Sequence, residues 1–186
     1  MISINMENFT EAEDLYDFWI AAGPDRWFDK DEEFDRAFRD RFLSLYERAA
    51  EGQCTAWLDR PSSALSLIIL LDQFPRNSFR GTPRVFATDP MAREMASIAI
   101  ERGHDMAFDL DLRGFFYMPF MHSEDLADQN KSVELQRELA WDWRRPALRH
   151  RDIIAAFGRF PHRNAILGRK TTAEEQHYLE NGGFSG

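Results

Sequence analysis

Apolar residues recur at three- and four-residue intervals along most of this chain, and no convincing stretch alternates between apolar and polar side chains. Phe34, Phe38 and Phe42 show the pattern clearly, and Gly52 follows where that helix should end. This spacing puts the apolar side chains on one face of an α-helix, whereas a half-buried strand would need a period of two. The pattern predicts an all-α fold of about seven to nine short helices joined by short turns.

The most apolar segment, Ala64–Gln73, is hydrophobic on every side and is therefore expected to form a central, buried helix. Pro75 should end this helix, because proline has no N–H for the helical hydrogen-bond ladder. The segment Phe74–Asn77 has a counterpart in Phe160–Asn164, since both read Phe-Pro, basic, Asn after an apolar helix. Two such turns suggest paired helical hairpins stacked as in a solenoid, and chance resemblance is the alternative.

Length and composition limit the class of protein. The 186 residues suffice for a single helical domain, residues 1–186, with a substantial core. The single Cys54 excludes an intrachain disulfide framework, and the amino-terminal residues lack the regions of a signal peptide. The longest strongly apolar run, Ala64–Leu71, is far shorter than the ~20 residues that cross a bilayer. We therefore expect a soluble cytoplasmic protein without a membrane partner.

The segment 144–170 gathers eight arginines and lysines and a single acid, Asp152, in a chain whose formal net charge is -9. That overall acidity argues against nucleic acid as a partner. Gly158 is expected to end a helix, and Arg159 and Arg163 lie just beyond it. Guanidinium groups pair well with carboxylates and phosphates. These arginines therefore either converge on an anionic ligand or form ion pairs with acids of the chain itself.

Two histidines lie where they can serve either structure or acid–base chemistry. Ser123 is expected to cap a helix with Glu124 in its first turn, and His122 immediately precedes that cap. His150 shares an apolar helix face with Ile153. A histidine beside a carboxylate is a common general acid–base pair, so His122, Glu124 and His150 are the catalytic candidates. The structural alternative is that both rings only pack among aromatic and apolar neighbours.

Asp72 ends a helix that is otherwise apolar, so its carboxylate should be buried. An unpaired buried charge is very costly. Arg76 lies one helical turn further on, and the arginines of segment 144–170 are the other available cations. We predict an ion pair between Asp72 and one of these arginines.

The sequence contains none of the motifs that identify a cofactor or a metal centre. It has no P-loop, no dinucleotide-binding glycine pattern, no nucleophile elbow and no HExxH helix. The polar residues His122, Glu124, His150, Asp152 and His162 have no spacing that is diagnostic of metal ligands. No metal site and no cofactor are therefore predicted.

Several long, ordered motifs of this chain resemble a bacterial family. They are Leu71–Asn77, His122–Glu124 with Gln129, and His150–Ile154 with Phe157–Asn164, and the similarity extends from Phe18 and Trp19 to the tail Gly182–Phe184. The chain is identified as a member of the family called domain of unknown function 924. The resemblance implies a tetratricopeptide-like fold, in which antiparallel helix pairs stack into a right-handed superhelix with a concave inner face. It implies no reaction, because the family has no established activity.

The leading hypothesis is a helical binding module with a pocket for an anionic small molecule or the acidic end of a peptide. Nine polar residues near helix ends would line the pocket: Asp72, Arg76, Asn77, His122, Glu124, His150, Arg159, Arg163 and Asn164. One competing hypothesis is a metal-independent hydrolase or isomerase that uses a histidine and Glu124 as acid and base. The other is a purely structural polar network in an interaction scaffold, in which arginines neutralise buried acids of the chain.

Overall fold

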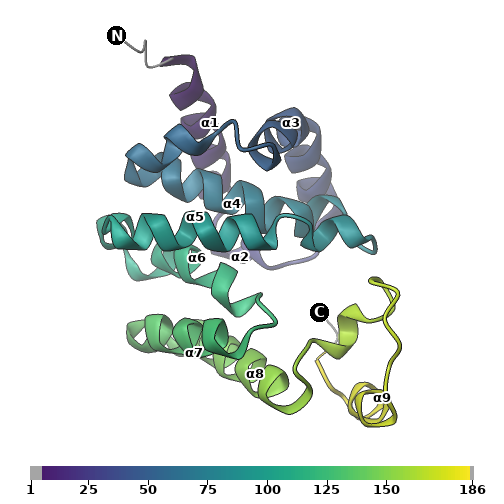
Figure 1. Cartoon of the computed structure of the whole chain (residues 1–186). Helices are drawn as coiled ribbons and strands as arrows, with labels where there is room; N and C mark the ends of the chain where they lie inside the picture. Colours follow the sequence, from purple (N-terminus) through teal and green to yellow (C-terminus); the bar gives the residue numbers. More distant parts are fainter. Residues whose placement is uncertain (1–5, 185–186) are drawn as a thin grey trace. The chain divides into compact units, whose positions relative to one another are not determined.

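The structure is a computed structural model that describes residues 6–184. Within this range every regular element is a helix and there is no strand (Figure 1). The α-helices are α1 (Met6–Ala22), α2 (Pro24–Trp27), α3 (Glu32–Ala50), α4 (Pro61–Ser78), α5 (Asp89–Glu101), α6 (Leu110–Met121), α7 (Leu126–Leu135), α8 (Trp141–Phe157) and α9 (Ala173–Glu180). Short 3-10 helices connect them: η1 (Thr55–Asp59), η2 (Pro83–Phe86), η3 (His104–Ala107), η4 (Gln136–Glu138) and η5 (Pro161–Arg163). The predicted all-α class is confirmed.

The chain divides into two compact units. The first comprises the described residues up to Arg80 together with Arg84–Pro119, and the second comprises Gly81–Pro83 and the described residues from Phe120 onward. The helices α1 to α5 and most of α6 therefore belong to the first unit, and α7 to α9 belong to the second. The single domain over residues 1–186 and the tetratricopeptide-like superhelix stay predictions.

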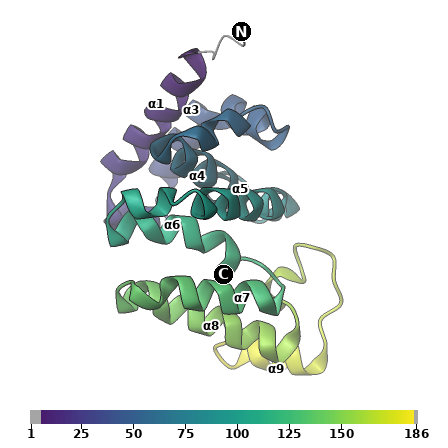
Figure 2. The ribbon, with the colours of Figure 1, turned by 60° about the vertical axis from the view of Figure 1, so that its left-hand side comes forward.

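Helix α4 is the centre of the first unit. It contacts α1, α3 and α5, which lie around it (Figure 1, Figure 2). The side chains of Leu65, Ile68 and Leu71 are fully shielded from solvent, as expected for a helix that is apolar all round. Ser66 is equally buried, and its hydroxyl donates a hydrogen bond of 2.8 Å to the carbonyl oxygen of Ala12 in α1. The predicted central helix is confirmed.

Pro75 does not end α4, so the predicted end of this helix is wrong. The helix continues to Ser78 with the proline inside it. A proline in this position leaves the carbonyl oxygen of Leu71, four residues earlier, without its helical N–H donor. Thr88 supplies a replacement, because its hydroxyl donates a hydrogen bond of 2.6 Å to that oxygen. The helix therefore passes the proline without leaving a buried carbonyl unsatisfied.

The second unit is built on α7 and α8, which run side by side (Figure 2). Helix α9 packs on α8 through the rings of Phe157 and Tyr178, whose centroids are 5.0 Å apart. Gly158, with a φ of 67°, ends α8 in the left-handed conformation, as predicted. The segment Phe160–Asn164 that follows contains η5 and is a turn, whereas its sequence counterpart Phe74–Asn77 is helical. The two segments are therefore not equivalent turns.

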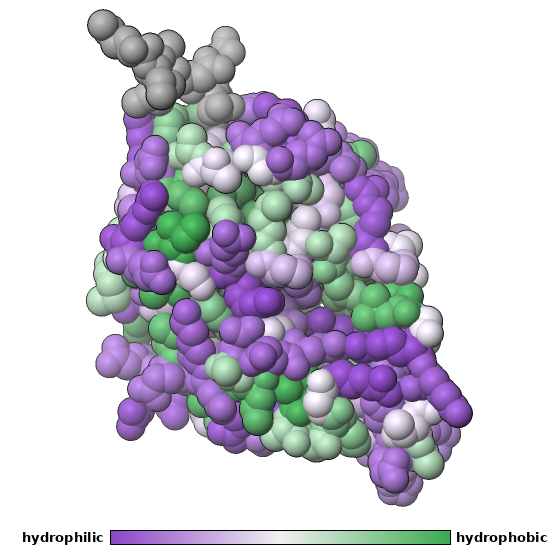
Figure 3. Space-filling model, viewed as in Figure 1, coloured by the Kyte–Doolittle hydropathy of each residue, from purple (hydrophilic) through white to green (hydrophobic). Residues whose placement is uncertain are grey.

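The described helices include no membrane span, since none of them is both long and apolar enough to cross a bilayer. The face shown in Figure 3 mixes hydrophilic and hydrophobic side chains, and neither kind covers it continuously. The cytoplasmic location stays a prediction.

Candidate functional site

In the first unit, Arg76 joins two buried carboxylates. Its guanidinium donates hydrogen bonds of 2.8 and 3.1 Å to Asp89 and one of 2.6 Å to the backbone carbonyl oxygen of Asp72. The carboxylate of Asp72 lies 3.5 Å from the same guanidinium, and its side chain is 1% exposed. Burial alone would lower the pKa of Arg76, but the two carboxylates raise it. The predicted ion pair between Asp72 and an arginine is confirmed.

Asn77 lies near the end of α4 and contacts Asp35 of α3. Its amide donates a hydrogen bond of 2.6 Å to one oxygen of Asp35, and Arg80 donates one of 2.9 Å to the other. Asn77 also lines a small hollow of about 290 Å³ together with the exposed arginines Arg36, Arg39 and Arg80. Its side chain therefore ties α3 to α4.

In the second unit, the basic segment pairs with two carboxylates. Arg159 donates hydrogen bonds of 2.5 and 2.8 Å to the two oxygens of Glu175, and Asn164 donates one of 3.1 Å to the same carboxylate. The hydrogen bonds from Arg159 are the main reason that the pKa of Glu175 falls to about 2. Arg169 donates hydrogen bonds of 2.6 and 2.9 Å to the two oxygens of Glu124. Two arginines of this segment thus form ion pairs with acids of the chain itself.

Glu124 lies before a helix rather than in its first turn. Asp125, and not the predicted Ser123, caps α7 by accepting hydrogen bonds from two backbone N–H groups of the first turn. Asp and Ser are equally good N-caps, so their order in the sequence could not decide between them. Glu124 also accepts the N–H of Phe160 at 2.8 Å. Burial alone would raise the pKa of Glu124. These hydrogen bonds lower the pKa instead, and the bond from Arg169 contributes most.

Three histidines and Phe160 form a chain of neighbouring rings. The ring centroids of His122 and His150 are 6.5 Å apart, and the Phe160 ring lies 5.3 Å from His150 and 5.5 Å from His162. Nδ1 of His150 is 2.8 Å from the carbonyl oxygen of Pro146, so this nitrogen carries the hydrogen of a neutral ring. Burial lowers the pKa of His150 to about 3 and that of His162 to about 4. Both rings are therefore neutral at pH 7.

Arg163 packs against the same phenylalanine. Its guanidinium carbon is 4.4 Å from the centroid of the Phe160 ring, and its side chain donates a hydrogen bond of 3.0 Å to the carbonyl oxygen of His122. The residue is 6% exposed, so its charge acts in a poorly solvated environment. Burial is the main cause that lowers the pKa of His162, and the charge of Arg163 is the next largest.

The nine predicted lining residues are distributed over both units. His122, Glu124, His150, Arg159, Arg163 and Asn164 lie in the second unit, and the contacts above connect them. Asp72, Arg76 and Asn77 lie in the first unit. A pocket common to all nine and the catalytic roles of His122, Glu124 and His150 stay predictions.

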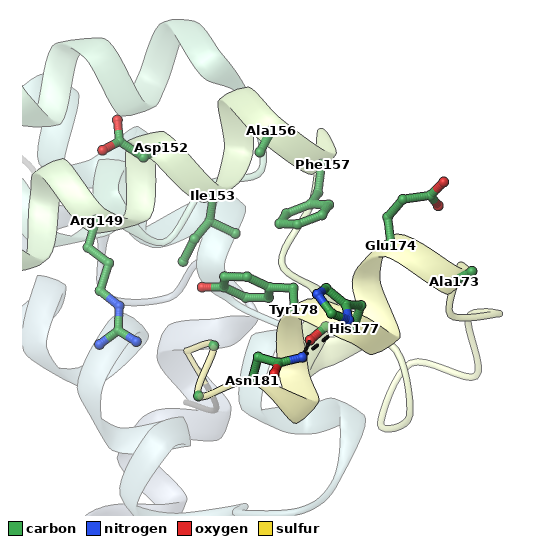
Figure 4. Close-up of a pocket in the computed structure, with 12 residues that line it drawn as sticks. Arg149, Asp152, Ile153, Ala156, Phe157, Ala173, Glu174, His177, Tyr178 and Asn181 are labelled. Atoms are coloured by element: carbon green, nitrogen blue, oxygen red, sulfur yellow. Dashed lines mark hydrogen bonds between the residues drawn. The ribbon is translucent and has the colours of Figure 1, made fainter.

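A large groove lies between α8 and α9, and its volume is about 1040 Å³ (Figure 4). One wall is a stripe of α8 residues spaced three and four apart, namely Arg149, Asp152, Ile153, Ala156 and Phe157. The other wall comes from α9 and the residues after it, namely Ala173, Glu174, His177, Tyr178, Asn181, Gly182 and Gly183. Figure 4 shows Ile153, Phe157 and Tyr178 in the middle, with Arg149 toward one end and Glu174 toward the other. This site, the α8–α9 groove, is apolar along its middle and charged at its ends.

Comparison with known proteins supports the assignment made from the motifs. The model of a family described as bacterial proteins of unknown function (DUF924) matches residues 15–183. The chain belongs to this family. It is also similar to the solved structure of a protein of unknown function from Agrobacterium tumefaciens, with 52% sequence identity and a TM-score of 0.93 over 94% of this chain and 99% of that one. No curated protein matches the chain.

The sequence prediction for this DUF924 member missed the α8–α9 groove. The helical spacing of Arg149, Ile153 and Phe157 could have indicated one wall of the groove, because residues with this spacing share one face of α8. No motif marked Tyr178 or the other α9 residues as the opposite wall. Among the described residues, no three His, Cys, Asp or Glu side chains lie close enough together to hold a metal ion.

Proposed function

We propose that this DUF924 protein binds a small amphipathic anion in the α8–α9 groove. The volume of about 1040 Å³ is at the upper end of the range for small-molecule sites. Such sites combine an apolar lining with a few polar groups that orient the ligand. Ile153, Phe157 and Tyr178 supply the apolar lining, and Arg149 supplies the polar group for the anion.

The state of Arg149 is the observation that carries the proposal. Its side chain is exposed, and it forms no ion pair with any residue in the described range 6–184. The nearby Asp152 is already paired with Arg151, at 2.6 Å. Glu174 lies toward the opposite end of the groove and would repel a carboxylate there (Figure 4). The ligand is therefore oriented with its anionic group at Arg149 and its apolar part along the middle of the groove.

The contacts of the residues that the sequence predicted to line a pocket favour a structural role for them instead. The guanidinium groups of Arg76 and Arg159 each make two hydrogen bonds to a carboxylate of the chain. Arg169, which was not among the predicted lining residues, binds the predicted lining residue Glu124 in the same way. An arginine engaged in this way has little capacity left for an external anion. Acid–base catalysis by His150 gains no support, because a histidine whose pKa is about 3 is a weak base near neutral pH.

Titration of the protein with octanoate, followed by NMR, tests the proposal. Octanoate should perturb the resonances of Ile153, Phe157 and Tyr178, whereas octylamine of the same chain length should not. R149Q should weaken octanoate binding about two- to five-fold, the range of an exposed ion pair. R145Q is the matched control, because Arg145 is also exposed on α8 but does not line the groove. Equal octanoate affinity in R149Q and R145Q, or no change in the groove resonances, would refute the proposal.

A further inference from the structure

An aromatic side chain already occupies a slot beside the groove. The ring centroid of Phe184 lies 4.7 Å from that of His150 and 4.9 Å from that of His162, with both rings in edge-on orientations. The guanidinium carbon of Arg149 is 5.1 Å from the same phenylalanine ring. We call the surroundings formed by His150, His162 and Arg149 the ring site.

The ring site combines aromatic walls with cations. Phe160 contacts both histidines, and the guanidinium carbon of Arg163 lies over the Phe160 ring, 4.4 Å from its centroid. Nδ1 of His162 is buried and has no hydrogen-bond partner among the described residues. Aromatic rings favour edge-to-face neighbours and nearby cations. These walls therefore suit a flat ring that carries, or lies next to, a negative charge.

Backbone hydrogen bonds to Tyr178 also hold the segment of Phe184 in place. Its N–H donates a hydrogen bond of 2.9 Å to the hydroxyl oxygen of Tyr178, and the N–H of Gly183 donates one of 2.9 Å to the carbonyl oxygen of the same tyrosine. The Phe184 side chain is only partly buried. Two glycines, Gly182 and Gly183, precede it, and glycine gives the backbone more conformational freedom than any other residue. Phe184 can leave the slot through a change in these few backbone angles.

The ring site and the α8–α9 groove are continuous. Arg149 and Tyr178 line the groove, and the same two residues contact Phe184. A molecule in the groove with its anionic group at Arg149 therefore lies next to the phenylalanine. When Phe184 leaves, the space that its ring occupied beside the Arg149 guanidinium is open to the ring of such a molecule.

We propose that the ligand of the groove is an aromatic carboxylate whose ring replaces Phe184 between His150 and His162, with its carboxylate on Arg149. This inference rests on the proposed function, because it specifies the ligand of the same groove. Phe184 then acts as an internal competitor for the ring. An aliphatic acid of similar size lacks a flat ring and stays in the groove.

Two acids of equal carbon skeleton, 3-phenylpropionate and 3-cyclohexylpropionate, test the proposal by calorimetric titration of the full chain. F184A empties the slot, so it should bind 3-phenylpropionate about five-fold more tightly than the unmodified protein, or about 1 kcal/mol. Its affinity for 3-cyclohexylpropionate should change less than two-fold. In NMR spectra of the complex, the ligand ring should show cross-relaxation with the ring protons of His150 and His162.

A second variant displaces Phe184 from the slot without removing its side chain. A Cβ atom at Gly183 would lie 2.6 and 2.7 Å from ring atoms of Tyr178, so G183A should displace the segment while retaining every side chain of the ring site. It should show the same selective gain for the aromatic acid. If both acids bind but neither variant changes their ratio, the ring site is refuted and the groove stands. If neither acid binds to any of the three proteins, the proposed function fails as well.

Discussion

The hydroxyl of Thr88 donates a hydrogen bond to the carbonyl oxygen of Leu71, with 2.6 Å between the two oxygens. Leu71 is the residue whose carbonyl would accept the N–H of position 75 if that position were not a proline. The threonine precedes α5, so a side chain from one helix start completes the hydrogen bonding of another helix. The buried proline of α4 and the start of α5 are therefore energetically coupled.

Replacement of Thr88 tests this coupling. T88V should lower the free energy of unfolding by about 1–3 kcal/mol, because the buried Leu71 oxygen loses its donor. In a P75A background the same change should cost about 1 kcal/mol less, since alanine at position 75 restores an N–H for Leu71. The hydroxyl of Tyr46 also forms a hydrogen bond with Thr88. T88V loses this bond in both backgrounds, so its contribution cancels in the double-mutant cycle. Urea denaturation of the four proteins gives the values, and an equal cost of T88V in both backgrounds would contradict the coupling.

Removal of Arg76 should be far more damaging than removal of a neighbouring arginine. R76M leaves two carboxylates, Asp72 and Asp89, buried without their shared cation, and the expected loss of stability is about 3–5 kcal/mol. R80M is the control, because Arg80 is half exposed and Asp35 keeps its bond from Asn77, so about 1 kcal/mol or less is expected. Similar losses of stability in the two variants would show that the buried cluster around Arg76 contributes no more to stability than the exposed ion pair of Arg80.

The ion pair of Glu175 with Arg159 should make stability depend on pH in the acid range. The folded-state pKa of Glu175, about 2, lies below its ordinary value of 4.5. Its contribution is therefore complete above pH 4.5 and is lost as the pH falls toward 2. E175Q should be less stable than the unmodified protein at pH 7, and the difference should shrink on acidification. Thermal unfolding at several pH values measures this, with E174Q as the exposed neighbouring control; a difference independent of pH would exclude the linkage.

Gln129 should be essential to the connection between α6 and α7. Its buried amide donates hydrogen bonds of 2.7 Å to the Met121 carbonyl oxygen and 2.6 Å to that of Ser123. Q129M removes both donors while keeping an apolar chain of similar length, and we expect a loss of about 2–3 kcal/mol in urea denaturation. N130M changes the exposed neighbour and should alter stability by about 0.5 kcal/mol or less. Equal stability of the two variants would mean that solvent or other groups replace the amide.

Several features were predictable because they depend on local geometry. The burial of Asp72 predicted an ion pair with an arginine, and Arg76 was one of the candidates because residues four apart on a helix are neighbours. Gly158 was expected to end α8 because glycine adopts the left-handed conformation at no steric cost. The Ser123 cap was wrong for an equally local reason, since Asp125 offers the same capping chemistry two residues later. The site was less predictable, because Tyr178 and Phe184 carry no motif and gain significance only beside α8.

The amino-acid sequence alone determined the helical class, the central apolar helix, the family and the pairing of Asp72 with an arginine. Each depends on residue types and spacings within a few turns, where helix geometry sets the distances. Tertiary structure decided that Thr88 would satisfy Leu71, that Glu124 would pair with Arg169, and that α9 would complete a groove on α8. The partners in these contacts come from separate segments, and no local spacing specifies how segments that far apart fold back on one another.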